Sequence, residues 1–221
     1  MADDKSRVIT TAQVEAFRAQ MRGEILDPSS PSYDATRVVW NGMIDRRPTL
    51  IARCRNAADV AASIGFARDH GLAIAVRSGG HNVAGYAVCD GGLMIDMSAM
   101  NGVRVSPGLD RAIVEGGATW GDVDAATTPF GRATPGGLIS ATGVAGLTLS
   151  GGIGWLRGRH GLSCDNLLAA DVVTADGNLV YTSETENPDL LWALRGGGGN
   201  FGVVVSFEFK LHTIEPELMF C

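Results

Sequence analysis

The sequence predicts a globular domain in which helices and strands are mixed, and three observations lead to this prediction. The 221 residues are 45% hydrophobic, which is enough for a packed core in one large domain or two small ones. Early in the chain a strand-like run, a helical segment and a second strand-like run follow one another. Glycine is concentrated in a few loops instead of being spread evenly along the chain.

The first half of the chain is predicted to contain a β-α-β unit. Val14, Phe17 and Met21 recur at helical spacing behind a threonine cap, which predicts an initial helix. Further on, an alanine-rich segment that Gly71 ends lies between two short apolar runs typical of strands. In chain order we expect a helix over 11–21, a loop after the proline-containing cluster at 27–31, a strand over 49–54, a helix over 57–70 and a strand over 72–77.

The second half is predicted to be richer in strands. Asp176 and Gly177 stand at the centre of a predicted tight turn between two strands, and Asn187 begins a short helix. The run from Val203 to Leu211 is strongly typical of a strand. We expect strands over 92–97, 112–115, 168–174, 179–181 and 203–211, and helices over 119–128 and 187–194.

Charge and cysteine usage argue against several classes of partner. The net charge is −6 and the chain has no basic run, so a nucleic-acid partner is not expected. The acidic amino terminus is unlike a secretory signal and no apolar stretch reaches membrane-spanning length, so we expect a cytoplasmic protein without a membrane partner. The four cysteines form no Cys-x-x-Cys pair, which favours reduced thiols over a disulfide framework and predicts no metal site.

Two glycine-dense segments are candidate binding loops. The sequence RSGGHN, residues 77–82, follows a predicted strand, and its glycines allow a turn that holds His81 against whatever the backbone binds. There His81 could act as a base, a metal ligand or a nucleophile. Between Gly131 and Gly161 lie ten of the 30 glycines, although each costs about 1 kcal/mol in a helix interior. The two segments could offer backbone N–H groups to an anion such as a diphosphate.

A third glycine run, Gly197-x-Gly199-x-x-Gly202, formally matches the dinucleotide fingerprint. That fingerprint requires a strand before the glycines and a helix after them, whereas here a helix is predicted before and a strand after. A nicotinamide-dependent dehydrogenase is therefore a distant alternative. The motifs of P-loop enzymes, zincin proteases and α/β-hydrolases do not occur in the sequence.

Taken together, the motifs resemble the FAD-linked oxidases of the vanillyl-alcohol oxidase superfamily. The segments that carry the resemblance are RSGGHN at residue 77, PGGLISATGVAGLTLSGGIGWL at residue 135, GLSCDN at residue 161 and GGGNFGVV at residue 197. Within the superfamily the chain is most similar to the berberine-bridge-enzyme-like and 6-hydroxynicotine-oxidase-like branch. The resemblance covers residues 45–212 in one order without large gaps.

The resemblance implies an α+β fold, namely a two-lobed PCMH-type FAD-binding domain, with the substrate domain absent from this chain. It divides the sequence into an N-terminal helical segment (1–44), the FAD-binding domain (45–212) and the start of a missing substrate domain (213–221). The family's acid–base residues lie in that missing part, so no catalytic residue is assigned, and Tyr33, Tyr86 and Tyr181 carry no such assignment. We expect the missing lobe to cover apolar side chains of the last strand, which are Val203, Val205, Phe207 and Phe209.

The resemblance also implies FAD as the cofactor, with His81 bonded covalently to the 8α-methyl carbon of the flavin. The first glycine-rich loop would wrap the pyrophosphate, the second would line the flavin, and Val203 would contact the adenine end through its backbone. The implied FAD-binding residues are Arg77, Ser78, Gly79, Gly80, His81, Asn82, Gly136, Gly137, Thr142, Gly143, Gly146, Gly152 and Val203. For Gly151, Gly152 and Gly154 the alternative is that they only permit tight packing of the turn.

Some relatives add a second flavin bond from a cysteine four residues before a glycine that corresponds to Gly143. Here that position is Ile139, which has no nucleophile, and Cys164 is interpreted as a buried thiol. The reaction implied is hydride transfer from a small organic substrate to the flavin, which dioxygen then reoxidises. A catalytically silent FAD-binding fragment is the main alternative, and the substrate and the oligomeric state stay open.

Overall fold

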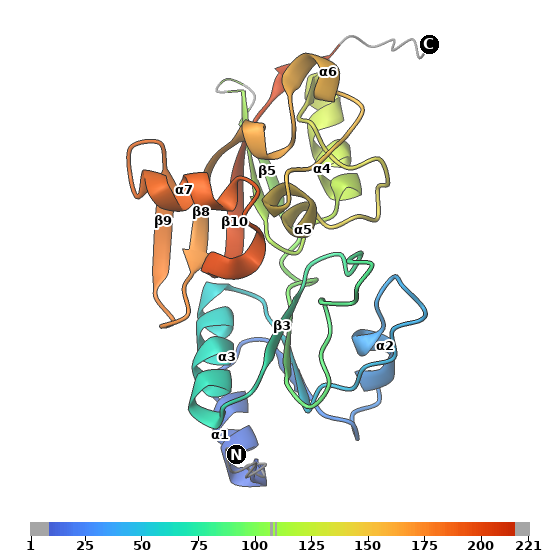
Figure 1. Ribbon diagram of the computed structural model, residues 1–221, viewed down its shortest axis with the longest axis vertical. Coiled ribbons are helices and arrows are strands. Elements are labelled where there is room, and N and C mark those ends of the chain that lie inside the picture. Colours follow the sequence, from blue (N-terminus) through green and yellow to red (C-terminus); the bar gives the residue numbers. More distant parts are fainter. Residues whose placement is uncertain (1–8, 107, 109, 215–221) are drawn as a thin grey trace.

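The computed structural model describes residues 9–106, 108 and 110–214. Its elements form two lobes, each built on one main β-sheet, which are stacked along the long axis of the molecule (Figure 1). This agrees with the two-lobed α+β architecture that the resemblance implied. None of the described helices combines the length and the apolar character needed to cross a membrane.

The first lobe holds a four-stranded sheet in the order β1-β2-β4-β3. Strand β2 pairs parallel with β4, and β4 pairs parallel with β3, as the predicted β-α-β unit requires. Apolar residues of β2 and β4 are buried on both faces, which is usual for parallel strands. The elements of this lobe are α1 (Thr11–Arg18), β1 (Glu24–Leu26), α2 (Tyr33–Arg37), β2 (Leu50–Arg53), α3 (Ala57–His70), β3 (Ile74–Arg77) and β4 (Leu93–Asp96).

Helix α3 shows how well local signals determine an element. The Asn56 side chain caps its first turn by accepting the N–H of Asp59 at 2.9 Å. Gly71 ends the helix in the left-handed conformation, with φ of 66°. The prediction of a helix over residues 57–70 ended by Gly71 is therefore confirmed.

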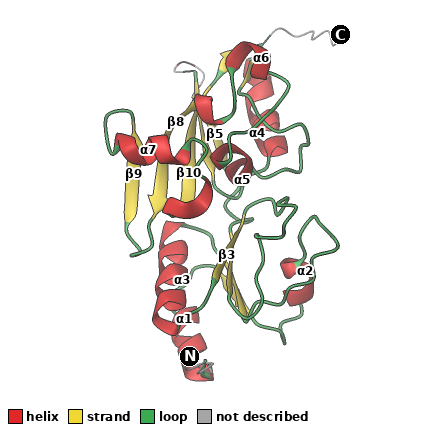
Figure 2. Ribbon diagram, viewed as in Figure 1, coloured by secondary structure: helices red, strands yellow, loops and turns green. Residues whose placement is uncertain are grey.

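The second lobe holds a five-stranded antiparallel sheet in the order β5-β6-β10-β8-β9. Figure 2 shows its helices lying in front of and beside these strands. The larger elements are β5 (Val103–Ser106), β6 (Arg111–Glu115), α4 (Trp120–Thr127), α5 (Val144–Leu149), β8 (Leu167–Val173), β9 (Leu179–Ser183), α7 (Pro188–Leu194) and β10 (Val203–Lys210). The short ones are η2 (Thr128–Phe130), β7 (Arg132–Ala133), α6 (Arg157–His160), η3 (Cys164–Asn166), η4 (Gly198–Phe201) and β11 (His212–Thr213).

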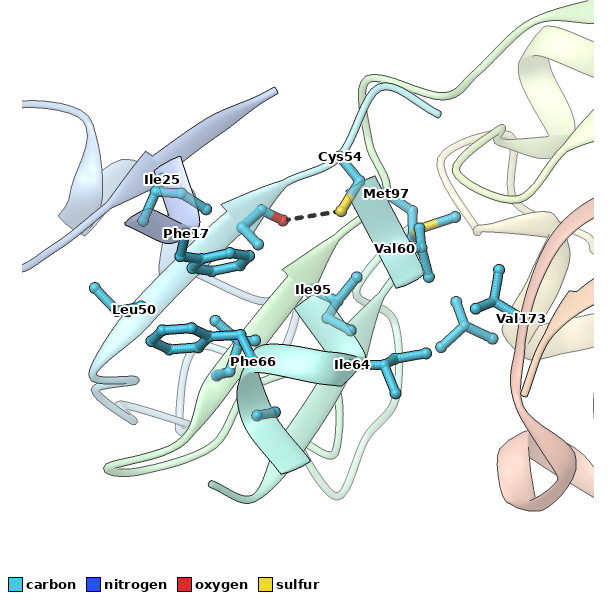
Figure 3. Packing of buried hydrophobic residues seen from close by; sticks show 14 of the residues in the cluster. Phe17, Ile25, Leu50, Cys54, Val60, Ile64, Phe66, Ile95, Met97 and Val173 are labelled. Carbon is cyan, nitrogen blue, oxygen red and sulfur yellow. Dashed lines mark hydrogen bonds between the residues drawn. The ribbon is translucent and has the colours of Figure 1, made fainter. Parts of the chain in front are cut away.

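The two lobes share a hydrophobic core. Val60 and Ile64 of α3 belong to the same buried cluster as Val173 of β8 and two valines of β10 (Figure 3). A helix of the first lobe thus packs against the end of the second sheet. Because apolar burial stabilises by about 25 cal/mol per Å² of buried surface, this shared cluster stabilises the contact between the lobes.

The expectation that a missing lobe covers apolar side chains of the last strand is wrong. Val203, Val205, Phe207 and Phe209 are all buried within this chain. Strand β10 lies between β6 and β8, and its register with β8 shifts between Val204 and Ser206. At this irregularity the side chains of β10 that would otherwise continue on one face of the sheet switch to the other face. Val203 and Val205 therefore pack toward α3, whereas Phe207 and Phe209 pack in the core of the second lobe.

Several elements lie where no helix or strand was predicted. Helix α2 occupies part of the expected loop, and α5 lies inside the glycine-dense segment. Val144 and Leu149 of α5 belong to the core of the second lobe, and an added Cβ at Gly146 meets nothing within 4 Å. Tertiary packing of one apolar face therefore offsets the low helix propensity of glycine.

A stacked histidine pair connects α6 to β11. The rings of His160 and His212 lie 3.8 Å apart between centroids, and His212 Nε2 is 2.7 Å from Asn166 Oδ1. Burial lowers the pKa of both histidines below 6.5, and for His212 the neighbouring His160 and Lys210 lower it further. Folding therefore favours the neutral form of both imidazoles.

The chain is expected to become less stable as the pH falls through about 6.5. The two histidines have a higher pKa in the unfolded state, so the unfolded state takes up more protons as the solution is acidified. The contribution of the pair to the free energy of unfolding is therefore present above about pH 6.5 and is lost as the pH falls below it. Melting temperatures measured across this range should fall, and the fall should be smaller for His212→Gln. An identical pH dependence in the variant would contradict this role of the pair.

Candidate functional site

A cavity of about 690 Å³ lies where the two lobes meet, and both glycine-rich segments line it. Small-molecule sites usually measure about 300–1,000 Å³, so this volume is within the normal range. The first lobe contributes β3 and the segment after it, residues 74–82, and the second contributes residues 142–150 and 198–204. The two loops that the sequence singled out are thus brought to one place.

The first glycine-rich segment, residues 77–82, presents polar groups without partners. Gly80 adopts φ of 68°, which allows the turn directly after β3. Across the residues that the structure describes, the backbone N–H groups of residues 79–82 donate no hydrogen bond. The Ser78 Oγ is buried and also lacks a partner. Since buried polar groups normally have partners, this segment is suited to an anionic ligand such as a diphosphate.

The two glycine-rich segments touch through their backbones. A Cβ added at Gly79 would lie 2.2 Å from the backbone nitrogen of Gly143. One added at Gly143 would lie 2.3 Å from the nitrogen of Gly79 and 2.6 Å from Ser78 Oγ. Real Cβ atoms do not approach other atoms so closely, so this contact needs glycine at both positions. The N–H of Val144 also donates to Ala118 O at 2.9 Å, which fixes the second segment beside α4.

Most of the residues implied to bind FAD line this cavity. They are Ser78, Gly79, Gly80, His81, Asn82, Thr142, Gly143, Gly146 and Val203. The others, Arg77, Gly136, Gly137 and Gly152, lie outside its lining.

The glycines outside the lining have packing partners in the protein itself. A Cβ at Gly136 would lie 2.4 Å from the Trp120 ring, and one at Gly152 would lie 2.4 Å from Ser163 Oγ. A Cβ at Gly154 would lie 1.7 Å from the carbonyl oxygen of Gly136. For Gly152 and Gly154 these contacts match the alternative in which the glycine only permits tight packing of the turn, whereas a Cβ at Gly151 would make an ordinary contact with Leu162 at 3.8 Å.

Sequence reasoning missed part of the lining. Ile74 and Val76 of the edge strand β3 are 41% and 39% exposed and face the cavity, where they offer an apolar surface. Gly198, Gly199 and Asn200 also line it, although the glycine run that contains them fails as a dinucleotide fingerprint. That failure is confirmed, because α7 precedes the run and β10 follows it. The signal that could have placed this run at the site was its membership in GGGNFGVV, one of the segments that carry the family resemblance.

His81 lies at the cavity with its ring held by stacking. The Trp40 ring packs against it at 5.5 Å between centroids and 23° between planes. Within the described part of the chain, neither nitrogen of His81 has a hydrogen-bond partner, and no cluster of three or more His, Cys, Asp or Glu could hold a metal. A ring nitrogen of His81 is therefore available to act as a nucleophile.

The other candidate side chains are less suited to chemistry at this cavity. Tyr33 is buried and donates its hydroxyl to Pro48 O at 2.6 Å, and Tyr181 lies on β9 outside the lining. Tyr86 lines the cavity but is 72% exposed. Cys164 is buried, and burial raises the pKa of its thiol, so the prediction of a buried thiol is confirmed.

The sequence is similar to a known protein family and to individual known proteins. The family model of the FAD binding domain matches residues 48–183. The chain is 43% identical over 199 residues to (R)-6-hydroxynicotine oxidase of Paenarthrobacter nicotinovorans, covering 90% of this chain and 43% of that protein.

Two solved structures show the same fold. The BBE-like 1 protein of Physcomitrella patens matches with a TM-score of 0.86 and 28% identity, over 90% of this chain and 44% of that one. Glucooligosaccharide oxidase of Acremonium strictum, described with a 6-S-cysteinyl, 8α-N1-histidyl FAD, matches with a TM-score of 0.84 and 37% identity, over 90% and 42%.

The chain spans less than half the length of these relatives. The matched family model nevertheless covers more than half of the chain and includes both β3 with His81 and the second glycine-rich segment. The resemblance stated from the motifs is thereby confirmed, and the chain belongs to the FAD-binding domain family of the FAD-linked oxidases in the vanillyl-alcohol oxidase superfamily.

Proposed function

We propose that this chain is the FAD-binding part of an FAD-linked oxidase, with the cofactor held in the cavity between the lobes and bonded covalently to His81. The observation that supports this most is the meeting of two glycine-rich segments, an unpartnered serine hydroxyl and an imidazole at one cavity.

Each part of the lining would have a separate task. The N–H groups of residues 79–82 and the Ser78 hydroxyl would donate hydrogen bonds to the diphosphate. Ile74 and Val76 would cover an apolar part of the cofactor, and the cavity continues to Val203, where the adenine end would lie. His81 would carry the bond to the 8α carbon, which prevents loss of the cofactor.

When bound, the flavin would supply the redox chemistry by accepting a hydride from a C–H bond next to oxygen or nitrogen in a small organic substrate and passing two electrons to dioxygen. The protein part described here would orient the cofactor and exclude water. A catalytically silent FAD-binding module is the second candidate, because no catalytic acid or base is assigned among the described residues that line the cavity. Release of hydrogen peroxide with candidate substrates would distinguish the oxidase from the silent module.

We also propose a cytoplasmic location, which the free thiols of Cys54, Cys89 and Cys164 support.

The proposed cofactor is tested by a titration that compares FAD with FMN. In a His81→Ala background, where binding is reversible, FAD should bind at least about tenfold more tightly than FMN, equivalent to about 1.4 kcal/mol. The reason is that the cavity extends from His81 to Val203 and Gly199 and so has room beyond a mononucleotide. Flavin absorbance and fluorescence quenching report the binding. Equal affinity for the two flavins, or a preference for a nicotinamide dinucleotide, would contradict the proposal.

A further inference from the structure

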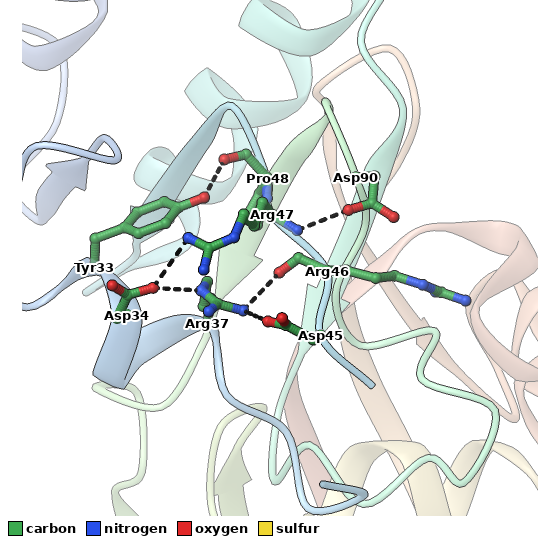
Figure 4. A network of polar contacts seen from close by, with 8 residues as sticks. All are labelled: Tyr33, Asp34, Arg37, Asp45, Arg46, Arg47, Pro48 and Asp90. Carbon is green, nitrogen blue, oxygen red and sulfur yellow. Dashed lines mark hydrogen bonds and ion pairs between the residues drawn. The ribbon is translucent and has the colours of Figure 1, made fainter. Parts of the chain in front are cut away.

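A short loop that the sequence motifs do not include lies directly against His81. We define residues 38–44 as the Trp40 loop. Arg37 closes its base, since this buried side chain forms ion pairs with Asp34 and Asp45 and donates to Arg46 O at 3.2 Å (Figure 4). Such a buried, multiply bonded guanidinium holds the two ends of the loop together.

The Trp40 loop forms hydrogen bonds with the chain on both sides of His81. The backbone N–H of Trp40 donates to Gly80 O at 3.1 Å, one residue before the histidine. The Asn41 side chain donates to Val83 O at 2.8 Å, two residues after it. The loop therefore determines the position of the backbone that carries the imidazole.

A second pair of hydrogen bonds joins Arg46 to the chain farther after His81. Arg46 donates from Nη1 to Gly85 O at 2.9 Å and to Val88 O at 3.1 Å. The base of the Trp40 loop and the chain after His81 are thus joined as one unit. Motion of the histidine relative to Trp40 is restricted.

The Trp40 ring completes this arrangement. It is 63% exposed, which is unfavourable for the largest apolar side chain, and the ring contact found for it is with the His81 imidazole. His81 lines the cavity and Trp40 does not. Stacking restrains the imidazole through its face, whereas a hydrogen bond would occupy one of the two nitrogens. The ring is therefore oriented while its in-plane lone pair stays free.

We infer that Trp40 is a positioning residue for covalent attachment of the flavin, which rests on the proposed function of His81. In the attachment step the imidazole nitrogen of His81 that carries the free lone pair forms a bond to the 8α carbon, the other imidazole nitrogen loses its proton, and one C–H bond of that methyl group breaks, releasing its proton. The electron pair of the broken bond passes to the ring system, and dioxygen takes up two electrons and two protons to give hydrogen peroxide. Trp40 acts in this step only by holding the imidazole in line with the methyl group.

The test follows the rate of attachment in the full 221-residue chain after FAD is added in saturating amount to flavin-free protein. Flavin that stays with acid-precipitated protein is measured over time. Trp40→Leu should attach flavin at least about tenfold more slowly, because a misaligned reacting group loses about that much or more. Trp40→Phe keeps an aromatic face and should recover most of the rate.

Two controls separate positioning from a general structural effect. Trp192→Leu removes a tryptophan that is 79% exposed on α7 and should leave the rate unchanged. In the His81→Ala background, adding Trp40→Leu should leave the dissociation constant of FAD unchanged. If Trp40→Leu attaches flavin as fast as the wild type, or if its loss is accounted for by weaker FAD binding, the inference is overturned. Absence of covalent flavin in the wild type would instead overturn the proposed link to His81, and this inference with it.

Discussion

His81→Ala is expected to release all of its flavin on acid denaturation, whereas the unmodified chain should keep its yellow colour in the precipitate. The imidazole lies at the cavity with no hydrogen-bond partner among the described residues, and the neighbouring segments are the ones suited to the diphosphate. Removing its nitrogen removes the nucleophile and leaves the rest of the site in place. Alanine at this position should therefore abolish the covalent bond without preventing reversible binding.

Proteolysis and mass spectrometry identify the bonded residue. We expect the flavin mass on the peptide that contains His81 and on no other. A second bond of the kind described for glucooligosaccharide oxidase is not expected, because Cys164 is buried outside the cavity lining and Ile139 has no nucleophile. His70→Ala, on α3, serves as the matched control and should keep the covalent flavin. Flavin found on a Cys164 peptide, or complete release from the unmodified chain, would show the assignment to be wrong.

Gly143→Val is expected to weaken FAD binding at least about a hundredfold, equivalent to about 2.8 kcal/mol. Its first side-chain carbon would overlap the backbone of Gly79 and the hydroxyl of Ser78, so the two glycine-rich segments must move apart. The same overlap should destabilise the fold by about 1–3 kcal/mol, the usual range for overpacking. Denaturant unfolding and flavin titration measure the two effects separately.

The control for Gly143→Val uses a glycine that has room for a side chain. Gly158 lies in α6, where an added Cβ meets nothing within 4 Å, and valine there should leave FAD binding unchanged. Gly80→Val is a different case, since its nearest neighbour would be 3.4 Å away but its φ of 68° disfavours any β-branched residue. If Gly143→Val binds FAD normally, contact between the two segments is not needed for the site.

Local sequence signals predicted those elements whose ends carry strong caps or turns. Helix α3 follows its asparagine cap and ends at a left-handed glycine, and α4 begins with a reciprocal cap between Thr119 and Asp122. The Asp-Gly signal also predicted the turn between β8 and β9, but the hydrogen bond from Gly177 N–H to Thr174 O places Ala175 and Asp176 at its centre, with Gly177 following them at φ of 89°. Each of these signals acts within a few residues, so it can be recognised without knowledge of the fold.

Elements stabilised by distant partners could not be predicted in this way. Helix α2 buries Tyr33 and Arg37, whose partners Pro48 and Asp45 lie beyond the helix, and α5 forms in a glycine-rich segment because its apolar face enters the core. The irregularity in β10 moved Phe207 and Phe209 into the core of the second lobe, contrary to the simple alternation along the strand. Only the packed structure contains the interactions that decide these cases.

For the candidate site, the sequence by itself determined the family and the cofactor class and singled out His81 as a candidate, because the order of its glycine-rich motifs resembles that of the FAD-linked oxidases. Only the tertiary structure decided which glycines face the cavity and which contact the protein itself, as Gly143 and Gly136 illustrate. It alone also placed Trp40 against His81, 41 residues away in sequence (81 − 40). The physical reason is that a motif specifies the conformations available to a backbone, whereas close approach between segments depends on the packing of the whole chain.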